Sequence, residues 1–112
     1  MSGIGIVRRW TARATPVGAR KYVRFFEETL VPALARIEGH RGALVTLRLS
    51  GEGVEIAVET KWESMEAVRR FAGEMVARAV VEPEAQALLT SFDEEVTHLE
   101  VAVDTVNGRA PK

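Results

Sequence analysis

Apolar and polar residues alternate from Ile4 to Ala14, and this two-residue period predicts a first β-strand, with Arg8 falling on its apolar side. Apolar residues then recur at helical spacing from about Ala19 to Glu38, which predicts a first helix. Pro32 lies inside that pattern and predicts a kink or a split into two helices. Gly39 is placed where a helix C-terminal cap is expected.

Two further alternating runs, Ala43 to Ser50 and Val54 to Trp62, are joined by a short Gly-rich link and predict a β-hairpin. A turn on Gly51-Glu52 pairs Leu49 with Val54, whereas a turn on Glu52-Gly53 shifts the register by two residues. Both registers keep the same residues on the same face, so the pattern fixes the faces and leaves the register open.

Ser64 is a good N-cap for a second helix, which would end near Gly73. The pattern from Glu74 to Val81 is ambiguous. Pro83 favours the first turn of a short helix, and Val96 to Val103 alternates as a last strand. The order of elements predicts an α+β, ferredoxin-like βαββαβ sandwich with a four-stranded antiparallel sheet in the order 4-1-3-2 and an extra short helix before the last strand.

In such a fold both predicted helices cover one face of the sheet, and residues 1–103 form one domain followed by a flexible tail, 104–112. The alternation assigns these residues to the helix side: Ile4, Ile6, Arg8, Trp10, Leu47, Leu49, Ile56, Val58, Thr60, Trp62, Leu99 and Val101. It assigns these to the opposite side: Val7, Arg9, Thr11, Arg13, Thr46, Arg48, Glu55, Glu59, Lys61, His98 and Glu100. That second face has no cover within the chain, and the pattern leaves open a solvated face or a homodimer through sheet faces.

Composition excludes several classes of function. The 112 residues carry a net charge of −1 with a pI near 6.1, which argues against a nucleic-acid partner. No cysteine is present, and the two histidines lack a metal-ligand spacing, so we expect no disulfide and no metal site. Without a membrane-length apolar run or a signal-peptide pattern, a cytoplasmic protein with no membrane partner is expected.

The run Glu59-Thr60-Lys61-Trp62-Glu63-Ser64-Met65-Glu66-Ala67-Val68 resembles the strand end and helix start of the antibiotic biosynthesis monooxygenase (ABM) family, which are dimeric α+β barrel proteins. Three more segments fit the same pattern: LARIEGHRGA from Leu34, FAGEMVARAVVEPEAQALL from Phe71 and FDEEVTHLEV from Phe92. The resemblance extends from Val7 to Val103. It implies the ferredoxin-like fold and the dimer, and for some members cofactor-free oxygenation of polyketide-like phenols.

By this resemblance Trp62 matches an aromatic residue that lines the family's pocket between sheet and helices. A core position is the equal alternative: the indole occupies a strand end, where the sheet meets the helices, and its N–H needs a partner if it is buried. Many members carry a histidine on the following helix, about where this chain has Phe71 and Ala72. Haem-degrading members also need an asparagine on the first strand, and none lies between Met1 and Ala14. Haem breakdown is therefore disfavoured.

Two residues are candidate catalytic groups. Arg8, a cation on an apolar stripe, could stabilise an enolate or phenolate, or could form an internal salt bridge or reach the surface. His98 titrates near neutral pH and could act as a base, although the alternation places it on the outer face, where an interface role is favoured. His40 is interpreted as a loop residue.

The leading hypothesis is a cofactor-independent monooxygenase for a small aromatic substrate, phenolic or polyketide-like, in a pocket between sheet and helices. The candidate pocket walls are Tyr22, Phe25, Phe26, Trp62, Phe71 and Met75. The alternative is a non-catalytic small-molecule-binding or stress-associated dimer. An isomerase ranks last, because no acid–base pair is evident on the helix side.

Overall fold

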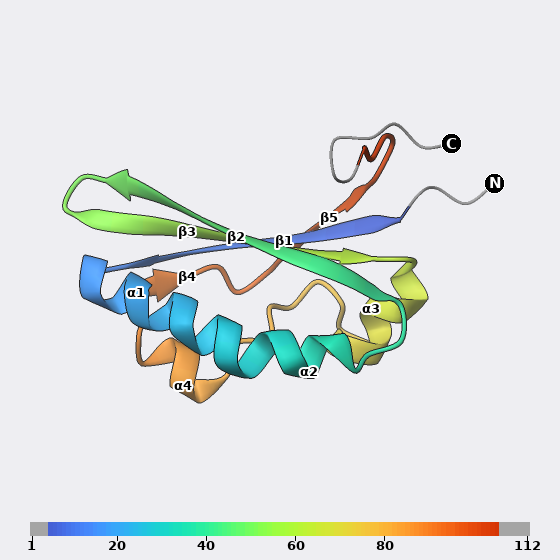
Figure 1. Cartoon of the computed structure of the whole chain (residues 1–112), viewed down its shortest axis with the longest axis horizontal. Coiled ribbons are helices and arrows are strands. Elements are labelled where there is room, and N and C mark those ends of the chain that lie inside the picture. Colours follow the sequence, from blue (N-terminus) through green and yellow to red (C-terminus); the bar gives the residue numbers. More distant parts are fainter. Residues whose placement is uncertain (1–4, 106–112) are drawn as a thin grey trace.

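One antiparallel sheet and a layer of helices against one of its faces make up the molecule (Figure 1). The computed structural model describes residues 5–105. In chain order the elements are β1 (Ile6–Ala14), α1 (Pro16–Phe25), the π-helical segment η1 (Phe26–Leu30), α2 (Val31–Ala35), β2 (His40–Ser50), β3 (Gly53–Trp62), α3 (Met65–Ala72), α4 (Pro83–Gln86), β4 (Ser91–Phe92) and β5 (Thr97–Glu100).

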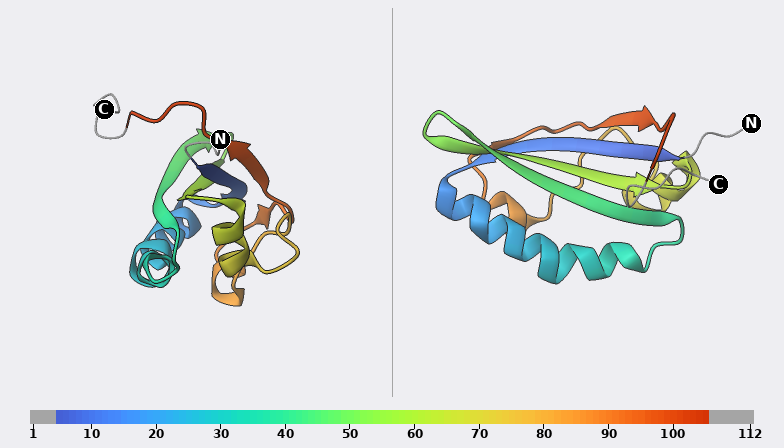
Figure 2. Two further views of the ribbon diagram at one scale, coloured as in Figure 1. Left: turned by 90° about the vertical axis from the view of Figure 1, so that its right-hand side faces the viewer. Right: turned by 45° about the horizontal axis from the view of Figure 1, so that its top comes forward.

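The sheet order is β2-β3-β1-β4, and β5 also pairs with β1. The predicted order 4-1-3-2 is therefore confirmed, with the last strand divided into two short pieces along β1. β4 pairs with the end of β1 at Ala12, and β5 pairs with its beginning at Ile6. Viewed from the end, α1–α2 lie below β2 while α3 and α4 lie on the other side of the same face (Figure 2).

The first helix begins at Pro16, earlier than predicted, because Thr15 caps it by accepting a hydrogen bond from the Gly18 N–H at 3.0 Å. The interruption expected at Pro32 appears as η1 directly before it, where the Val31 N–H donates to the Phe26 carbonyl. Proline has no N–H to donate and crowds the preceding turn, and the wider π turn accommodates this.

Gly39 does not cap this helix, contrary to the prediction, because α2 ends at Ala35 and its C-cap residue is Arg36. Gly39 instead has φ +94 in the turn into β2, and a Cβ there would lie 2.5 Å from the Cβ of Ala67. The glycine is required by this close approach of the turn to α3.

The hairpin register resolves to the first of the two alternatives, since Leu49 pairs with Val54 across a turn on Gly51-Glu52. Gly51 takes φ +64, as such a turn requires. Strand β2 begins at His40, three residues before the predicted start, and its register on β3 shifts between His40 and Gly42. This irregularity is a β-bulge that leaves Arg41 as the extra residue.

The face assignment of the last strand was wrong. His98 pairs with the inward-facing Arg8, and Leu99 pairs with the outward-facing Val7. Leu99 is 44% exposed on the outer face, while His98 lies on the helix side. A buried guanidinium needs hydrogen-bond partners, and His98 supplies one. The free energy lost if Arg8 lacked this partner outweighs the free energy gained by burying Leu99.

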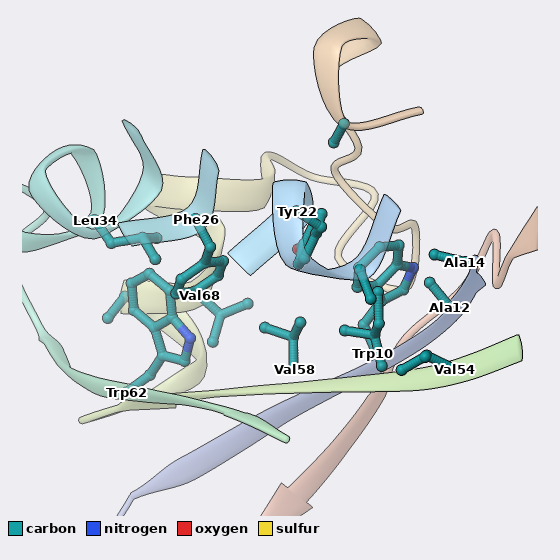
Figure 3. Close-up of a cluster of buried hydrophobic side chains, with 14 residues drawn as sticks. Trp10, Ala12, Ala14, Tyr22, Phe26, Leu34, Val54, Val58, Trp62 and Val68 are labelled. Carbon is teal, nitrogen blue, oxygen red and sulfur yellow. The ribbon is translucent and has the colours of Figure 1, made fainter. Parts of the chain in front are cut away.

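Strand β3 carries the centre of the core, and Trp62 and Ile56 are among its fully buried side chains, together with Val68 of α3. Trp62 and Trp10 lie at opposite ends of this cluster (Figure 3). Leu47 and Leu49 lie on the predicted helix side, opposite Ile56 and Val54, but are 47% and 79% exposed. They lie on the edge strand β2, which the helices leave partly uncovered.

The second helix follows its prediction closely. Ser64 caps α3 by accepting from the Ala67 N–H at 3.1 Å, and Gly73 follows the helix with φ +79. Residues 74–82 form an irregular segment that returns to the sheet before α4. Of the predicted tail, Asp104 forms an ion pair with Lys61 at 3.3 Å, and 106–112 lie outside the described residues.

Candidate functional site

A small cavity lies between the inner face of the sheet and the helices, with a volume of about 60 Å³. Strands β1 and β3 form its floor, α1 to α2 form one wall, and α3 with the segment before α4 forms the other. Its lining residues are Arg8, Trp10, Tyr22, Phe26, Leu30, Leu34, Val58, Thr60, Phe71, Val80, Val81, Glu82 and Ala85. The lining is mainly apolar, and Arg8 and Glu82 are its charged side chains.

Arg8 is 4% exposed, which is rare for an arginine. Its guanidinium donates to the carbonyl oxygens of Val76 at 2.6 Å and Arg78 at 2.7 Å. Phe71 stands under the same group, with its ring centroid 5.6 Å from Cζ. The contacts fasten the irregular segment 74–82 to β1, so one side chain both lines the cavity and holds its cover in place.

No carboxylate compensates the charge of Arg8 among the residues that the structure describes. The salt bridges there use Arg9, Arg41, Arg48 and Lys61. Burial lowers the pKa of Arg8, but an arginine side chain stays protonated at neutral pH. A buried cation without a counter-ion beside an apolar cavity is suited to bind an anionic oxygen of a ligand.

His98 completes this polar cluster. Its Nε2 lies 3.0 Å from a guanidinium nitrogen of Arg8. An arginine N–H can only donate, so Nε2 must accept, and the imidazole is neutral with its proton on Nδ1. Burial and then the charge of Arg8 lower the pKa of His98. The structure therefore brings together the two candidate catalytic residues that the alternation had placed on opposite faces.

The neutral state of His98 predicts a pH dependence of stability. Because the folded pKa lies below the unfolded value of about 6.5, acidification protonates the unfolded chain first, and the free energy of unfolding falls as pH drops through that value. We expect a smaller fall for His98→Gln, which keeps an acceptor for Arg8 but does not titrate. Urea unfolding at about pH 7.5 and about pH 5.5, which bracket that pKa, measures the difference.

His40 serves as the internal reference in that experiment, because burial also lowers its pKa and both proteins retain it. An equal loss of stability in the wild type and His98→Gln would contradict a neutral His98 held by Arg8.

Tyr22 and Glu82 also line the cavity. Tyr22 is 3% exposed, and burial, followed by the negative charge of Glu82, raises the pKa of its hydroxyl. The phenol therefore stays protonated at neutral pH and can act as a hydrogen-bond donor. Trp10 beside it donates its indole N–H to the Asp93 carbonyl at 2.8 Å, so that ring is already fixed.

Trp62 is part of the core and does not line this cavity. It is 1% exposed, and its indole N–H donates to the Thr60 hydroxyl at 2.8 Å. Its ring stacks on Phe71 with centroids 5.6 Å apart, so Phe71 lies between the indole and Arg8 in the chain of contacts. Trp62 thus packs against the cavity-lining residue Phe71 without itself lining the cavity.

Among the other predicted pocket walls, Tyr22, Phe26 and Phe71 line the cavity, whereas Phe25 and Met75 do not. Phe25 packs against Tyr22 with ring centroids 6.4 Å apart, and Met75 is 63% exposed. Sequence reasoning missed the segment from Val80 to Glu82 as lining. Its only signal was the apolar pair Val80-Val81 just before Pro83, in a stretch whose structure the pattern left open.

A second, larger space adjoins the first. It is a groove of about 500 Å³ between the first helix and the beginning of β2. Its lining residues are Val23, Phe26, Glu27, Val31, Leu34, Ala35, His40, Gly42, Ala43 and Val45. Phe26 and Leu34 line both spaces and form the wall between them.

His40 is a strand residue of this groove, although the sequence suggested a loop. Its ring meets Trp62 edge-on with centroids 5.0 Å apart. Its Nδ1 is buried without a hydrogen-bond partner among the described residues. An unmade hydrogen bond at a buried polar atom costs about 1–3 kcal/mol. Burial lowers the pKa of His40, so the ring is neutral at pH 7.

Across residues 5–105, no three His, Cys, Asp or Glu side chains converge in a group that could hold a metal ion. No helix in that range is long and apolar enough to cross a membrane.

No protein-family model matches the chain, and no curated protein matches it. Among solved structures, the chain is similar to a monooxygenase from the gene ActVA-Orf6 of Streptomyces coelicolor, determined in complex with the ligand nanaomycin D. The two share 18% sequence identity and a TM-score of 0.56, over 90% of this chain and 88% of that chain. At this identity the likeness shows the fold, an α+β sandwich with an antiparallel ferredoxin-like sheet, and it agrees with the fold implied by the ABM resemblance.

Proposed function

We propose that this chain is a cofactor-independent monooxygenase of the ABM type, acting on a flat phenolic, polyketide-like substrate in the cavity beside Arg8. The observation that carries the proposal is Arg8 itself, a buried cation without a carboxylate partner among the described residues, next to a neutral histidine and an apolar cavity. The structural likeness to a monooxygenase is consistent with it.

The chemistry needs a base and an anion stabiliser within one hydrogen-bond network. His98 is not among the residues that line the cavity, so the substrate reaches it only once the cover of the cavity has moved. A phenolic oxygen placed between Arg8 and His98 would then take over the guanidinium N–H that now points to Nε2. His98 could then accept the substrate proton, and Arg8 would stabilise the resulting oxyanion. Because Arg8 lowers the pKa of His98, proton acceptance is favourable only once the oxyanion forms beside both groups.

For an anthrone the oxyanion is the enolate formed by loss of a CH₂ proton, and its negative charge is shared with that ring carbon, which then reacts directly with dioxygen. For an anthrone CH₂ group, one oxygen atom becomes the new carbonyl oxygen, and the other leaves as water with the two hydrogens of that carbon. The carbon is oxidised by the same number of electrons that reduce dioxygen, so this reaction needs no further reductant. The role of the protein is to bind the ring, move one proton and stabilise negative charge.

A substrate of this size requires the cover of the cavity to move. A volume of about 60 Å³ accommodates a few water molecules, since each needs roughly 10–15 Å³, but not fused rings. The cover is the segment 74–82, held by Arg8 through the carbonyls of Val76 and Arg78. An oxyanion that competes for the same guanidinium would loosen these bonds, and Gly73 at φ +79 is a suitable pivot.

The experiment is an oxygen-electrode assay with 1,8-dihydroxyanthrone and the purified chain treated with a chelator. Oxygen uptake that depends on the protein and yields the anthraquinone supports the proposal. Binding of the anthrone without oxygen uptake would instead support the non-catalytic binding protein. If no phenol in a panel bound to the protein or caused oxygen uptake, both functions would be refuted.

We also propose that two copies associate through their sheet faces. Figure 2 shows no helix over the outer face. Leu44 and Leu99 are 56% and 44% exposed there, and the charged pairs Arg9–Glu59 and Arg48–Glu55 are already matched within the chain. Charges that are already paired lower the desolvation cost of burying this face in a dimer. Burial of the exposed leucines stabilises the dimer by removing apolar surface from water.

Leu99→Glu is expected to weaken dimerisation at least about tenfold, because it places an unpaired carboxylate in the interface. Sedimentation velocity over a concentration series measures the dissociation constant. The matched control is Leu49→Glu, since Leu49 is 79% exposed on the opposite face. A monomeric wild type, or equal effects of the two substitutions, would rule out the sheet-face dimer.

A further inference from the structure

The groove between the first helix and β2 has the dimensions and lining of a binding site for a small molecule. Small-molecule sites are mainly apolar clefts of about 300–1,000 Å³ with a few polar groups that fix orientation. This groove, at about 500 Å³, falls within that range. Its described lining is apolar apart from Glu27 and His40, so His40 supplies a hydrogen-bonding group that sits directly on a strand.

Two backbone irregularities shape the groove from opposite sides. On β2, the bulge at Arg41 lets His40 face inward together with Ala43 and Val45. In an unbroken strand, His40 would share the outer face with Leu44, because side chains alternate. Bulges commonly re-aim a side chain next to a functional site.

On the helix side, the π-helical segment η1 begins at Phe26, a residue that lines the groove. π-helical turns within α-helices are frequently found at functional sites. Phe26 is 5% exposed and Leu34 is 3% exposed, and these two side chains separate the groove from the cavity. A ligand in the groove can therefore be bound without occupying the Arg8 cavity.

We infer that this groove is a second ligand site, for a flat apolar ring that carries one hydroxyl group directed at His40. The ring would lie between the helix residues Val31 and Ala35 and the β2 residues Ala43 and Val45. Nδ1 of His40 is buried, so the hydroxyl would meet the other ring nitrogen, Nε2. A hydroxyl can both donate and accept, so it matches that nitrogen in either neutral tautomer. This site does not depend on the proposed oxygenation, because none of its contacts involves Arg8 or His98.

The experiment is an NMR titration of the full chain with 1-naphthol and, in parallel, with naphthalene. We expect 1-naphthol to shift the Trp62 indole signal and the amide signals of Gly42 and Ala43, and to bind more tightly than naphthalene. Gly42 and Ala43 report on this site specifically because they line the groove and not the cavity, whereas Trp62 contacts both His40 and the cavity residue Phe71. Shifts confined to residues around Arg8, or equal affinity for the two probes, would overturn the inference.

His40→Phe separates binding from folding. It keeps an aromatic contact with Trp62 but removes the unpartnered nitrogen, so the chain should unfold at a higher urea concentration. The same change should lower the affinity for 1-naphthol about fivefold, as expected for one lost hydrogen bond, and leave naphthalene unaffected. Undiminished affinity for 1-naphthol in this variant would contradict a hydroxyl directed at His40.

A matched pair of charge substitutions tests the position of the ligand. Ala35→Glu introduces a carboxylate into the apolar lining and should reduce binding of both probes about tenfold. Ala33→Glu is the control, because Ala33 is also exposed on α2 but does not line the groove. If Ala35→Glu changed the oligomeric state and not probe binding, the groove would be an interface with a second copy, and the inference would be wrong.

Discussion

Arg8→Leu is expected to lower the rate of oxygen uptake with 1,8-dihydroxyanthrone at least about 100-fold, because it removes the group that would stabilise the oxyanion. Loss of a single oxyanion-stabilising donor typically costs 10²–10³ in turnover, about 2.7–4 kcal/mol. The effect should be at the upper end here, since the cation is 4% exposed and no other cation lines the cavity within residues 5–105. The measurement is the turnover rate at saturating substrate, with binding followed separately.

Arg8 also has a structural role, so the leucine variant alone would not suffice. Its loss leaves the carbonyls of Val76 and Arg78 without their donor and should loosen the segment 74–82. Arg8→Lys keeps the charge but lacks the planar fork that reaches both carbonyls. We expect it to regain part of the turnover with a weaker cover, seen as faster amide exchange in 74–82. Turnover near the wild-type rate in Arg8→Leu would exclude oxyanion stabilisation by this residue.

The hydrophobic pattern was sufficient for the fold because most elements have a strong period and clear ends. The two hairpin runs and the helix capped by Ser64 follow their predictions closely. The ends of helices and strands were harder to predict where proline and glycine are compatible with either a break or a helix start. Pro16 and Gly18 are residue types that commonly end a strand, yet here they lie in the first turn of α1 because Thr15 caps that helix. The register of the hairpin depended on turn geometry alone, which alternation does not encode.

The candidate site was harder to predict because polar contacts decided it. Alternation assigned Leu99 inward because it is apolar, and so moved His98 to the wrong face. The pairing of β5 with β1 instead follows the buried guanidinium of Arg8, which donates to the His98 imidazole at 3.0 Å. Such a requirement links residues 90 positions apart and leaves no local signature.

The position of His40 was also wrongly predicted from the sequence, for a different reason. Its inward direction depends on a β-bulge at Arg41, a change of period by one residue that a window of alternating positions cannot detect. Glycines on both sides made the segment look like a loop. The sequence does contain those glycines, Gly39 and Gly42, and the positive φ of each is consistent with an irregular strand start.

Trp62→Ala is expected to cause the largest loss of stability of any substitution considered, about 3–5 kcal/mol in the free energy of unfolding. The ring is 1% exposed, stacks on Phe71, meets His40 edge-on and hydrogen-bonds to Thr60, so its removal opens a cavity and leaves the Thr60 hydroxyl without its donor. A domain of this size is typically stable by about 5–15 kcal/mol, so the variant should be close to unfolding. Urea unfolding followed by far-UV circular dichroism measures the loss without relying on tryptophan fluorescence.

Trp62→Phe distinguishes the two roles that the sequence left open for this residue. If Trp62 is core, phenylalanine should recover more than half of the stability, because it retains the stacking on Phe71 and much of the buried area. Leu49→Ala serves as the control and should remain within about 0.5 kcal/mol of the wild type, since Leu49 is 79% exposed. If Trp62 were instead the wall of an open pocket, Trp62→Ala would lose less than about 1 kcal/mol, because water or ligand would already occupy the space in front of the ring. That outcome would return Trp62 to the binding surface and would require a cavity much larger than the 60 Å³ beside Arg8.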